Sequence, residues 1–428
     1  MCAKDQCAPT PPMGWNSWDC YAATVTEEQL LRNAEYMRKN LLPYGWEYIV
    51  CDIQWYEPLA GTGEGEYRPF APLCMDEYSR LIPAENRFPS SAGGKGFAPI
   101  AKKIHGMGLR FGIHIMRGIP RQAVHGHTPV KGAGLAADAI ANPFSICKWN
   151  GDMYGVDAGR KGAQDYYDSL FEMYASWGVD YVKVDDMCNT NMYPHAPYSG
   201  KAEIETIRRA IDRCGRAMVL SLSPGPAPID EAWHLKKHAN MWRITDDFWD
   251  RWDSLKDMFR RCEIWQSHGG PGSWPDCDML PLGRIGMGFH RPRQTNFTKD
   301  EQRTMMTLWC IFRSPLMLGC ELNDNDDWTL SLLANDEVLD VLKRGADSRQ
   351  IGRDNEQALW MNSAGDGAIN LALFNLSDKT RAVRCPVPGP QKMKARDLWN
   401  KRDLGTVEKE IAVEIAPHGA ALYRLNGS

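Results

Sequence analysis

The stretch Val179-Asp-Tyr-Val-Lys-Val-Asp-Asp186 is the part of the chain that most directly predicts its fold. Its β-branched and aromatic residues are typical of a buried strand in an α/β protein. Lys183 and Asp185 are two positions apart, so their side chains lie on the same face of that strand. A lysine beside an aspartate at the end of a strand suits a reactive site better than a core. We therefore predict that Asp185 is a nucleophile.

The composition is that of an ordinary globular protein with more than one domain. Of its 428 residues, 43% are hydrophobic and 24% are charged, which is typical of globular chains. A net charge of −4 provides no basic field, so a nucleic-acid partner is not expected. No apolar run approaches the roughly 18 to 20 residues of a membrane span, so we expect a soluble protein.

The N-terminus and the cysteines are the parts of the sequence that bear on compartment and metal binding. Residues 1–10 are polar, so no signal peptide is expected. A cytoplasmic or a periplasmic location fits this pattern, and Cys2 would also fit a processed lipoprotein. The 13 cysteines include no CxxC pair, which argues against a zinc site and a dense disulfide framework. We expect buried thiols, no metal and no cofactor.

Short apolar strands alternate with amphipathic helices through about the first 330 residues. The helix expected at 163–177 has an aromatic face and ends at Gly178. This alternation predicts a parallel sheet, which eight units would close into a (β/α)₈ TIM barrel; a doubly wound open sheet is the alternative. The pattern does not locate the seventh strand. The strands are predicted at 11–18, 48–52, 109–116, 179–185, 217–221, 241–247 and, as the last, 278–283, with a closing helix at 304–318.

Toward the C-terminus the pattern changes to one of period two. Hydrophobic residues alternate with others at 369–373, 411–415 and 421–425. Period two without helices predicts a small antiparallel β-sandwich. We therefore expect two domains, a catalytic barrel at 1–345 and a β-sandwich at 346–428.

Three of the predicted barrel strands end in aspartate, at Asp52, Asp185 and Asp247. A single aspartate at such a position commonly caps the following helix. Lys183 and Arg243, however, lie two and four residues before Asp185 and Asp247, so each cation shares a strand face with its carboxylate. Buried cations and carboxylates that converge at a barrel mouth are costly, which favours a functional reason for them.

Two opposed carboxylates, 16 tryptophans and the lack of a metal signature favour glycoside hydrolysis. Asp185, kept ionised by Lys183, would attack the anomeric carbon of the sugar. Asp247, with less charge compensation, would first donate a proton and later accept one. The sequence has no glycine-rich phosphate loop, which disfavours phosphoryl transfer.

Six motifs are spread over most of the chain. They are MGWNSW at 13–18, YIVCD at 48–52, WGVDYVKVD at 177–185, WRITDD at 242–247, WPDCDML at 274–280 and the segment 308–318. Together they resemble glycoside hydrolase family 27, the α-galactosidase and α-N-acetylgalactosaminidase family. The resemblance implies a barrel followed by a β-sandwich, retention of anomeric configuration, Asp185 as nucleophile and Asp247 as acid/base. It also implies sugar contacts from Trp18, Asp52, Lys183, Arg243 and Asp278.

Two departures from the family pattern bear on the sugar. The family usually has two adjacent aspartates after its second strand, which hold hydroxyls at C4 and C6, but here Ile53 follows Asp52. An apolar wall at C6 would suit a sugar without a hydroxyl there, such as β-L-arabinopyranose. The family position that reads the 2-substituent falls at Ser223, which would leave room for an N-acetyl group. The alternative is a rebuilt loop, because Pro224-Gly-Pro226 is not the usual continuation.

Two further departures concern the surroundings of the site. Gln54 and Met187 stand where the family has cysteines, so we expect the family's disulfides to be absent and a reducing compartment to be allowed. His114 stands where the family often has tyrosine. Its side chain would either touch the sugar or pack on the top of the barrel.

We therefore expect a retaining exo-glycosidase whose substrate is an oligosaccharide or glycoconjugate with a terminal α-linked galactose. α-Galactosidase activity ranks first, α-N-acetylgalactosaminidase activity second because of Ser223, and β-L-arabinopyranosidase activity third because of Ile53. A carbohydrate-binding protein on an inactive hydrolase scaffold is the alternative from another class. Both candidate catalytic aspartates argue against it.

Overall fold

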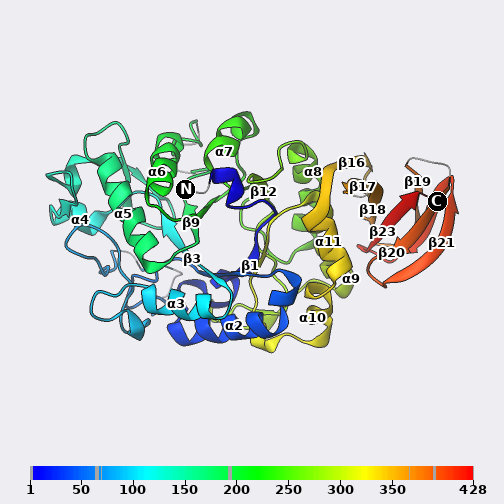
Figure 1. The fold of residues 1–428 in the computed structure, drawn as a ribbon, viewed down its shortest axis with the longest axis horizontal. Coiled ribbons are helices and arrows are strands. Elements are labelled where there is room, and N and C mark those ends of the chain that lie inside the picture. The colour runs from blue at the N-terminus through cyan, green and yellow to red at the C-terminus, as the bar shows by residue number, and fades with distance from the viewer. Residues whose placement is uncertain are drawn as a thin grey trace.

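Eight short parallel strands form the framework of the N-terminal part of the molecule (Figure 1). The structure is a computed structural model that describes residues 3–62, 67–68, 70–190, 195–365, 367–388 and 392–427, so Cys2 lies outside the described residues. The strands are β1 (Met13–Asn16), β2 (Tyr48–Cys51), β3 (Arg110–Met116), β9 (Tyr181–Asp185), β10 (Val219–Leu222), β11 (Met241–Arg243), β12 (Trp274–Asp276) and β15 (Leu316–Leu318).

The sheet closes on itself. Its strand order, with hydrogen-bonded neighbours adjacent, is β12-β11-β10-β9-β3-β2-β1-β15. A parallel bridge between Leu280 and Leu318 joins the segment after β12 to β15 at the other end of this order. The predicted (β/α)₈ barrel is therefore confirmed, and the open doubly wound sheet is not found.

Helices connect the strands and surround the barrel (Figure 1). The predicted helix at 163–177 is confirmed as α5, and Gly178 ends it with a left-handed φ of 86°. The main helices are α2 (Glu27–Asn40), α3 (Ala98–Gly106), α5 (Ala163–Trp177), α6 (Lys201–Arg213), α7 (Ala232–His238), α8 (Trp252–Trp265), α9 (Lys299–Phe312), α10 (Asp327–Leu333) and α11 (Asp336–Arg344). Within the described residues, none combines the length and apolar character that a membrane crossing requires.

Short elements occupy the loops between these strands and helices. They are α1 (Trp18–Tyr21), β4 (Ile119–Pro120), α4 (Arg121–His125), β5 (Pro129–Val130), β6 (Leu135–Ala136), β7 (Ala141–Ile146), β8 (Met153–Val156), β13 (Arg284–Ile285) and β14 (Arg293–Gln294). Most of them belong to the long connection between β3 and α5, where the sequence shows no regular pattern.

The seventh strand differs from the sequence prediction. It is β12, which lies directly before the stretch 278–283 where the last strand is predicted. Asp278 has a φ of 76°, a conformation that a β-strand does not contain, so the chain turns immediately after β12. The prediction of a strand at 278–283 is therefore wrong, although Leu280 makes the bridge that closes the barrel.

The eighth strand lies inside the stretch 304–318, which the sequence predicts as helix throughout. Helix α9 instead ends at Phe312, and Arg313 follows in a left-handed conformation with φ 71°. Pro315 also disfavours helical geometry in the residue before it. The remaining apolar residues, Leu316–Leu318, form β15 and pair with β1.

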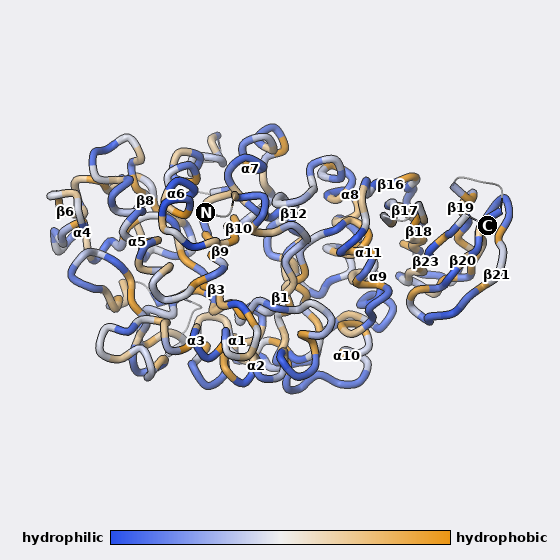
Figure 2. The backbone as a smooth tube through the Cα atoms, in the orientation of Figure 1, coloured by the Kyte–Doolittle hydropathy of each residue, from blue (hydrophilic) through white to orange (hydrophobic). Residues whose placement is uncertain are grey.

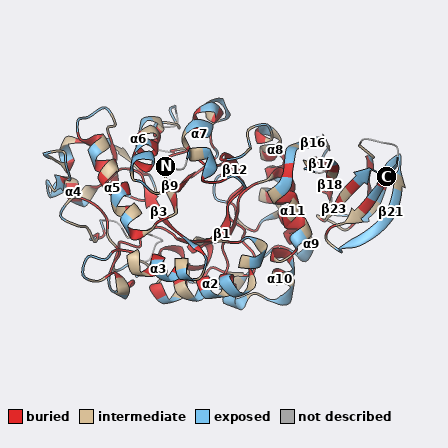
Figure 3. Ribbon diagram, in the orientation of Figure 1, coloured by how far each residue is buried: buried red, intermediate tan, exposed pale blue. Residues whose placement is uncertain are grey.

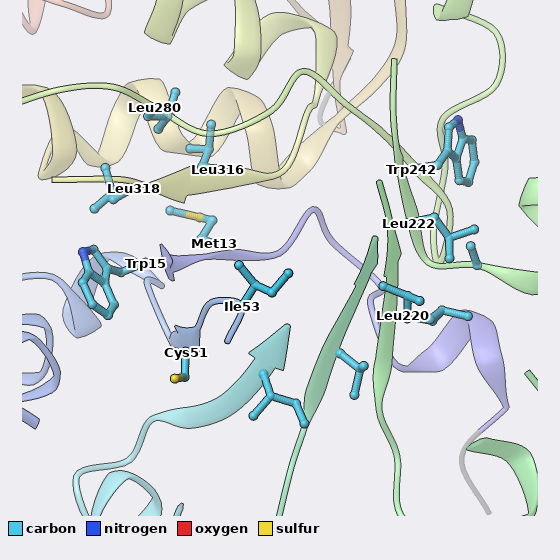
Figure 4. Packing of buried hydrophobic residues seen from close by; sticks show 14 of the residues in the cluster. Met13, Trp15, Cys51, Ile53, Leu220, Leu222, Trp242, Leu280, Leu316 and Leu318 are labelled. Atoms are coloured by element: carbon cyan, nitrogen blue, oxygen red, sulfur yellow. The ribbon is translucent and has the colours of Figure 1, made fainter. Parts of the chain in front are cut away.

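Hydrophobic side chains from the strands and from the inner faces of the helices make one large core. Figure 4 shows Met13 and Trp15 from β1 near Leu316 and Leu318 from β15, and all four side chains are buried. The hydrophobic residues follow the strands and the inward side of the helices in Figure 2, and the same parts are buried in Figure 3. The barrel is therefore a packed body whose polar groups gather at the strand ends.

The C-terminal part contains two antiparallel sheets, and the predicted β-sandwich is confirmed. One sheet has the order β16-β17-β18-β23-β20-β21 and the other pairs β19 with β22. Residues such as Leu371, Val383 and Ile411, from both sheets, form one hydrophobic cluster. The strands are β16 (Gly345–Arg353), β17 (Gln357–Ala364), β18 (Ala368–Asn375), β19 (Arg381–Pro386), β20 (Lys392–Asp397), β21 (Arg402–Glu408), β22 (Glu410–Ile415) and β23 (Ala420–Gly427).

Strands β1 and β2 approach each other closely at Gly14. The variant Gly14→Ala tests this close approach. An added Cβ would lie 2.6 Å from the Cβ and the carbonyl oxygen of Tyr48. We expect the free energy of unfolding to fall by about 1–3 kcal/mol, because overpacking forces the strands apart. The measurement is the midpoint of thermal or denaturant unfolding.

Gly106→Ala is the matched control. Gly106 ends α3, and an added Cβ there would meet nothing within 4 Å. We expect this variant to change the free energy of unfolding by no more than about 0.5 kcal/mol. Equal midpoints for the two variants would contradict the close packing of β1 on β2.

Candidate active site

A cavity of about 250 Å³ opens where the barrel strands end, which is where a barrel carries its functional groups. Eight of the ten residues that the sequence predicts for the site line this cavity. They are Trp18 after β1, Asp52 after β2, His114 in β3, Lys183 and Asp185 in β9, Arg243 in β11, Asp247 after β11 and Asp278 after β12.

Three side chains from the neighbouring strands β2, β3 and β9 form a line of contacts in the cavity wall. His114 Nδ1 lies 2.7 Å from Asp52 Oδ1, and His114 Nε2 lies 3.3 Å from Asp185 Oδ2. The second contact is an ion pair rather than a well-aligned hydrogen bond. Burial, the largest single influence, would lower the pKa of His114, but the charge of Asp52 and the contacts with Asp185 and Asp52 together outweigh it and raise the pKa. The position between two carboxylates therefore favours the imidazolium form.

Asp185 is held in its ionised form. Burial would raise the pKa of Asp185, but the close contact with His114 and then the charge of Lys183 outweigh it and lower the pKa to about 2. The backbone N–H of Asp186 also donates to Asp185 Oδ1, at 2.9 Å. Asp185 is therefore negatively charged at neutral pH.

Lys183 has a different partner from the one that the sequence predicts. Its Nζ lies 3.3 Å from Asp52 Oδ2, and this is its only ion pair within the described residues. Asp52 also accepts a hydrogen bond from Asn16 Nδ2 at 2.8 Å. Lys183 still helps to keep Asp185 ionised, as the sequence predicts, but His114 contributes first and Lys183 acts on Asp185 without a direct ion pair.

Arg243 is shared between two carboxylates on the other side of the cavity. Its Nη1 lies 2.8 Å from Asp247 Oδ1, and its Nη2 lies 3.1 Å from Asp278 Oδ2. The Arg243 side chain is 5% exposed, whereas the Asp247 side chain is 60% exposed. One buried cation thus serves two carboxylates, and Asp247 extends from it toward solvent.

Three acidic groups in this region have raised pKa values. Burial raises the pKa of Asp278 even beside Arg243, and burial together with the charge of Asp278 raises the pKa of Asp276 to about 7. Burial, and then the charge of Asp278, raises the pKa of Asp19 well above its ordinary value. Asp19 lines the cavity, and its Oδ2 has no hydrogen-bond partner among the described residues. It is therefore available to a hydroxyl group of a ligand.

Ile53 and Ser223, the other two predicted residues, do not line the cavity. The Ile53 side chain is fully buried in the hydrophobic core, among the side chains that Figure 4 shows. Ser223 is also fully buried, and Pro224 lines the cavity in its place. The wall at this point is therefore a proline ring, which favours the rebuilt-loop interpretation over open space beside Ser223.

Eight residues of the cavity wall were not predicted, and they are Asp19, Tyr67, Trp149, Pro224, Asp246, Phe248, Trp249 and Met279. Six of them are adjacent in sequence to predicted residues or to each other, so chain neighbourhood could have identified them. Tyr67 and Trp149 lie in long loops without periodic pattern and gave no such signal. Tyr67 stacks on Trp18 with ring centroids 6.0 Å apart, which makes an aromatic wall suited to a sugar face.

The acidic residues of the cavity do not form a group with metal-ligand spacing within the described residues. The one group with such spacing there is Glu205, His234 and His238, which lies outside the cavity. All 12 cysteines in the described part of the chain are free thiols. The chemistry of the cavity is therefore that of carboxylates, cations and aromatic rings.

Comparison with known proteins assigns both parts of the chain. A family model described as alpha galactosidase A matches residues 144–343, and one described as the alpha galactosidase C-terminal beta sandwich domain matches residues 354–425. An alpha-galactosidase of Cyamopsis tetragonoloba is 27% identical over 431 residues, which cover 99% of this chain and 88% of that protein.

Two solved structures are more similar. A GH27 β-L-arabinopyranosidase from Geobacillus stearothermophilus is 57% identical, with a TM-score of 0.96 and coverage of 99% of this chain and 98% of that one. A protein from Bacillus halodurans, provisionally assigned as an α-N-acetylgalactosaminidase, is 51% identical, with a TM-score of 0.88 and coverage of 98% and 97%. This chain therefore belongs to glycoside hydrolase family 27 and is a glycoside hydrolase.

Proposed function

We propose that this protein is a retaining exo-glycosidase that removes terminal β-L-arabinopyranosyl residues, with Asp185 as the nucleophile and Asp247 as the acid/base. The observation that carries the chemistry is the arrangement of Asp185 and Asp247 in one cavity with unequal charge compensation. The cavity of about 250 Å³ is smaller than the roughly 300–1,000 Å³ of sites for drug-sized ligands, which suits one terminal sugar ring.

In the first step, a carboxylate oxygen of Asp185 attacks the anomeric carbon, and the bond from that carbon to the glycosidic oxygen breaks. Asp247 gives its proton to the departing oxygen, so the leaving group departs as an alcohol. The exposed position of Asp247 places it toward the part of the substrate that leaves. Asp185 is suited to attack because it needs no proton removed first.

In the second step, a water molecule enters from the solvent side and gives a proton to the Asp247 carboxylate. Its oxygen then attacks the anomeric carbon, and the bond to Asp185 breaks, which restores both carboxyl groups. Two inversions at one carbon give net retention. Arg243 holds Asp247 in place for both transfers, and it is shared with Asp278.

Two observations favour β-L-arabinopyranose as the sugar. This sugar has the ring configuration of α-galactose but no hydroxymethyl group, and position 53, where the family usually has a second aspartate, is an apolar residue here. The arabinopyranosidase relative is 57% identical, whereas the alpha-galactosidase of Cyamopsis tetragonoloba is 27% identical. α-Galactosidase activity, which the sequence ranks first, is the second candidate, because relatives from Cyamopsis tetragonoloba and Arabidopsis thaliana carry that name.

The N-acetylgalactosaminidase alternative has weaker support. It depends on space beside Ser223, but Ser223 is buried and Pro224 lines the cavity there. The observation that favours it is the similarity to the Bacillus halodurans protein, which is provisionally assigned that activity.

Removing either proposed catalytic carboxylate tests the mechanism. We expect Asp185→Asn to lower kcat/KM by at least about 10³-fold, because the amide cannot act as the carboxylate nucleophile that forms the covalent intermediate. We expect Asp247→Ala to lower it by roughly 10²–10⁴-fold on substrates with poor leaving groups, and by less on nitrophenyl glycosides. Mass spectrometry after treatment with a fluorinated glycosyl fluoride should locate the trapped sugar on Asp185.

Asp253→Asn is the control for these variants. Asp253 is an exposed carboxylate in the first turn of α8 and does not line the cavity, so activity should be unchanged. Near-normal activity in Asp185→Asn, or a sugar attached elsewhere, would contradict the assignment of the nucleophile.

Comparison of three nitrophenyl glycosides tests the sugar. We expect kcat/KM to be higher for the β-L-arabinopyranoside than for the α-galactoside by up to about 10²-fold, since a site without a dedicated partner for an added hydroxymethyl group rejects it only moderately. The α-N-acetylgalactosaminide should be the slowest. Faster hydrolysis of the α-galactoside by the unmodified enzyme would favour the second candidate.

The contact between His114 and Asp185 predicts a change in pH dependence. Without the imidazolium, burial would raise the pKa of Asp185 from about 2, so more of it would be protonated and inactive at mildly acidic pH. In His114→Gln, the acidic limb of kcat/KM should therefore move to higher pH by roughly 1–3 units. The measurement is the pH profile of kcat/KM.

His105→Gln is the matched control for the pH profile. His105 Nε2 lies 2.7 Å from Asp180 Oδ2, which is also a histidine–aspartate pair, but neither residue lines the cavity. The acidic limb of kcat/KM in His105→Gln should coincide with that of the unmodified enzyme. An unmoved limb in His114→Gln would show that His114 does not control the ionisation of Asp185.

A further inference from the structure

Helices α6 and α7 lie next to each other on the outside of the barrel (Figure 1) and bring three possible metal ligands together. Glu205 comes from α6, and His234 and His238 come from α7. One ligand atom from each residue lies within 4.8 Å of those of the other two. None of the three lines the active-site cavity, so the proposed glycosidase mechanism does not account for them.

His234 is oriented as a metal-binding histidine usually is. Its Nδ1 lies 2.8 Å from the hydroxyl of Tyr198, and its Nε2 lies 3.2 Å from Glu205 Oε1. A hydrogen bond at one ring nitrogen fixes the tautomer and points the other nitrogen at the ion. The His234 side chain is 1% exposed, so this orientation is also fixed by packing.

A simple hydrogen-bonded cluster does not explain why His238 is present beside His234. The contacts among Tyr198, His234 and Glu205 would satisfy His234 without it. His238 follows His234 by four positions, so both side chains lie on one face of α7, and their ring centroids are 4.4 Å apart. Among the described residues, no hydrogen bond is found to the imidazole nitrogens of His238. Two imidazoles at this spacing beside a carboxylate are a chelating arrangement.

The charges around the cluster leave the carboxylate available. The only ion pair of Glu205 with an arginine within the described residues is a long contact of 3.7 Å to Arg209. Lys201 and Arg208, which are close enough to act on the two histidines, are paired with acidic residues at 2.8 and 2.7 Å. A bound cation would therefore meet one negative ligand and two neutralised neighbours, while Lys237 next to His238 makes no ion pair among the described residues.

We propose that Glu205, His234 and His238 bind one divalent first-row transition metal ion of the Zn²⁺ type. Two imidazoles and one carboxylate suit such an ion better than Ca²⁺ or Mg²⁺, which take oxygen ligands. Bonds of roughly 2.0–2.2 Å require the ligand atoms to draw closer than 4.8 Å. Glu205, with a side chain that is 39% exposed, and the half-buried His238 have room for this movement.

The position of the site indicates a stabilising role. Helix α6 connects β9 to β10, and α7 connects β10 to β11. These two units carry Asp185 and Arg243 at their strand ends, so an ion between the helices would fasten neighbouring parts of the framework under the active site. The ion would not take part in the reaction, because its ligands lie outside the cavity.

Titration of the full, tag-free chain with Zn²⁺ and Co²⁺ after treatment with EDTA tests the proposal. Calorimetry should show one equivalent bound, and Co²⁺ should give visible bands of nitrogen and oxygen ligation. His238→Ala and Glu205→Gln, which keeps a side chain able to contact His234, should each weaken binding at least about tenfold. Excess Zn²⁺ should raise the Tm of the unmodified protein but not that of His238→Ala.

His125→Ala is the matched control, because His125 is an exposed histidine on α4 outside the cluster. It should bind the metal ions as the unmodified protein does. Treatment with EDTA should leave kcat/KM unchanged, as expected for a site that does not touch the substrate. The proposal is overturned by the absence of saturable binding, by equal affinity in His238→Ala, or by a thiolate-to-cobalt band that places the ion on cysteine.

Discussion

The ion pairs buried at the strand ends are the constraint on which the rest of the structure depends. His114 lies between Asp52 and Asp185, and Arg243 pairs with the buried Asp278 as well as with the exposed Asp247. Removing one partner from such a buried pair leaves an uncompensated charge and costs roughly 3–5 kcal/mol. These contacts join side chains from separate strands, so the barrel must hold its strand ends in fixed relative positions. The packed hydrophobic interior provides that rigidity.

The two pairs of carboxylates in the cavity differ in how many cations lie beside them, and this difference separates the proposed catalytic roles. Asp52 and Asp185 have two cations beside them, His114 and Lys183. Asp247 and Asp278 share a single cation. Two carboxylates of one chemical type thereby acquire different tasks from their surroundings, as glycosidases require. Asp276 and Asp278 have raised pKa values on the side where negative charge exceeds positive charge.

Much of this arrangement follows from local sequence patterns. Period and strand-end residues predict the barrel, the β-sandwich and five residues of the cavity wall, because alternation along a strand is a local property. Three more, Trp18, His114 and Asp278, follow only from the resemblance to glycoside hydrolase family 27. The seventh and eighth strands are not predicted, since each has three residues and is defined by a turn at Asp278 or Arg313 that composition does not reveal. The contact between His114 and Asp185 links residues far apart in sequence, and single strands carry no signal for it.

Position 53 shows that a residue next to a site residue in sequence need not contact the substrate. Asp52 lines the cavity, so the next side chain along an extended backbone points to the opposite side, and Ile53 indeed lies in the hydrophobic core. A sugar would therefore not touch the Ile53 side chain in this geometry, and position 53 adds no polar group to the cavity wall. Asp186 is turned away in a different manner, because it follows β9 with a left-handed φ of 55° and lies behind the wall in an ion pair with Arg117. In both places a single carboxylate, Asp52 or Asp185, faces the cavity.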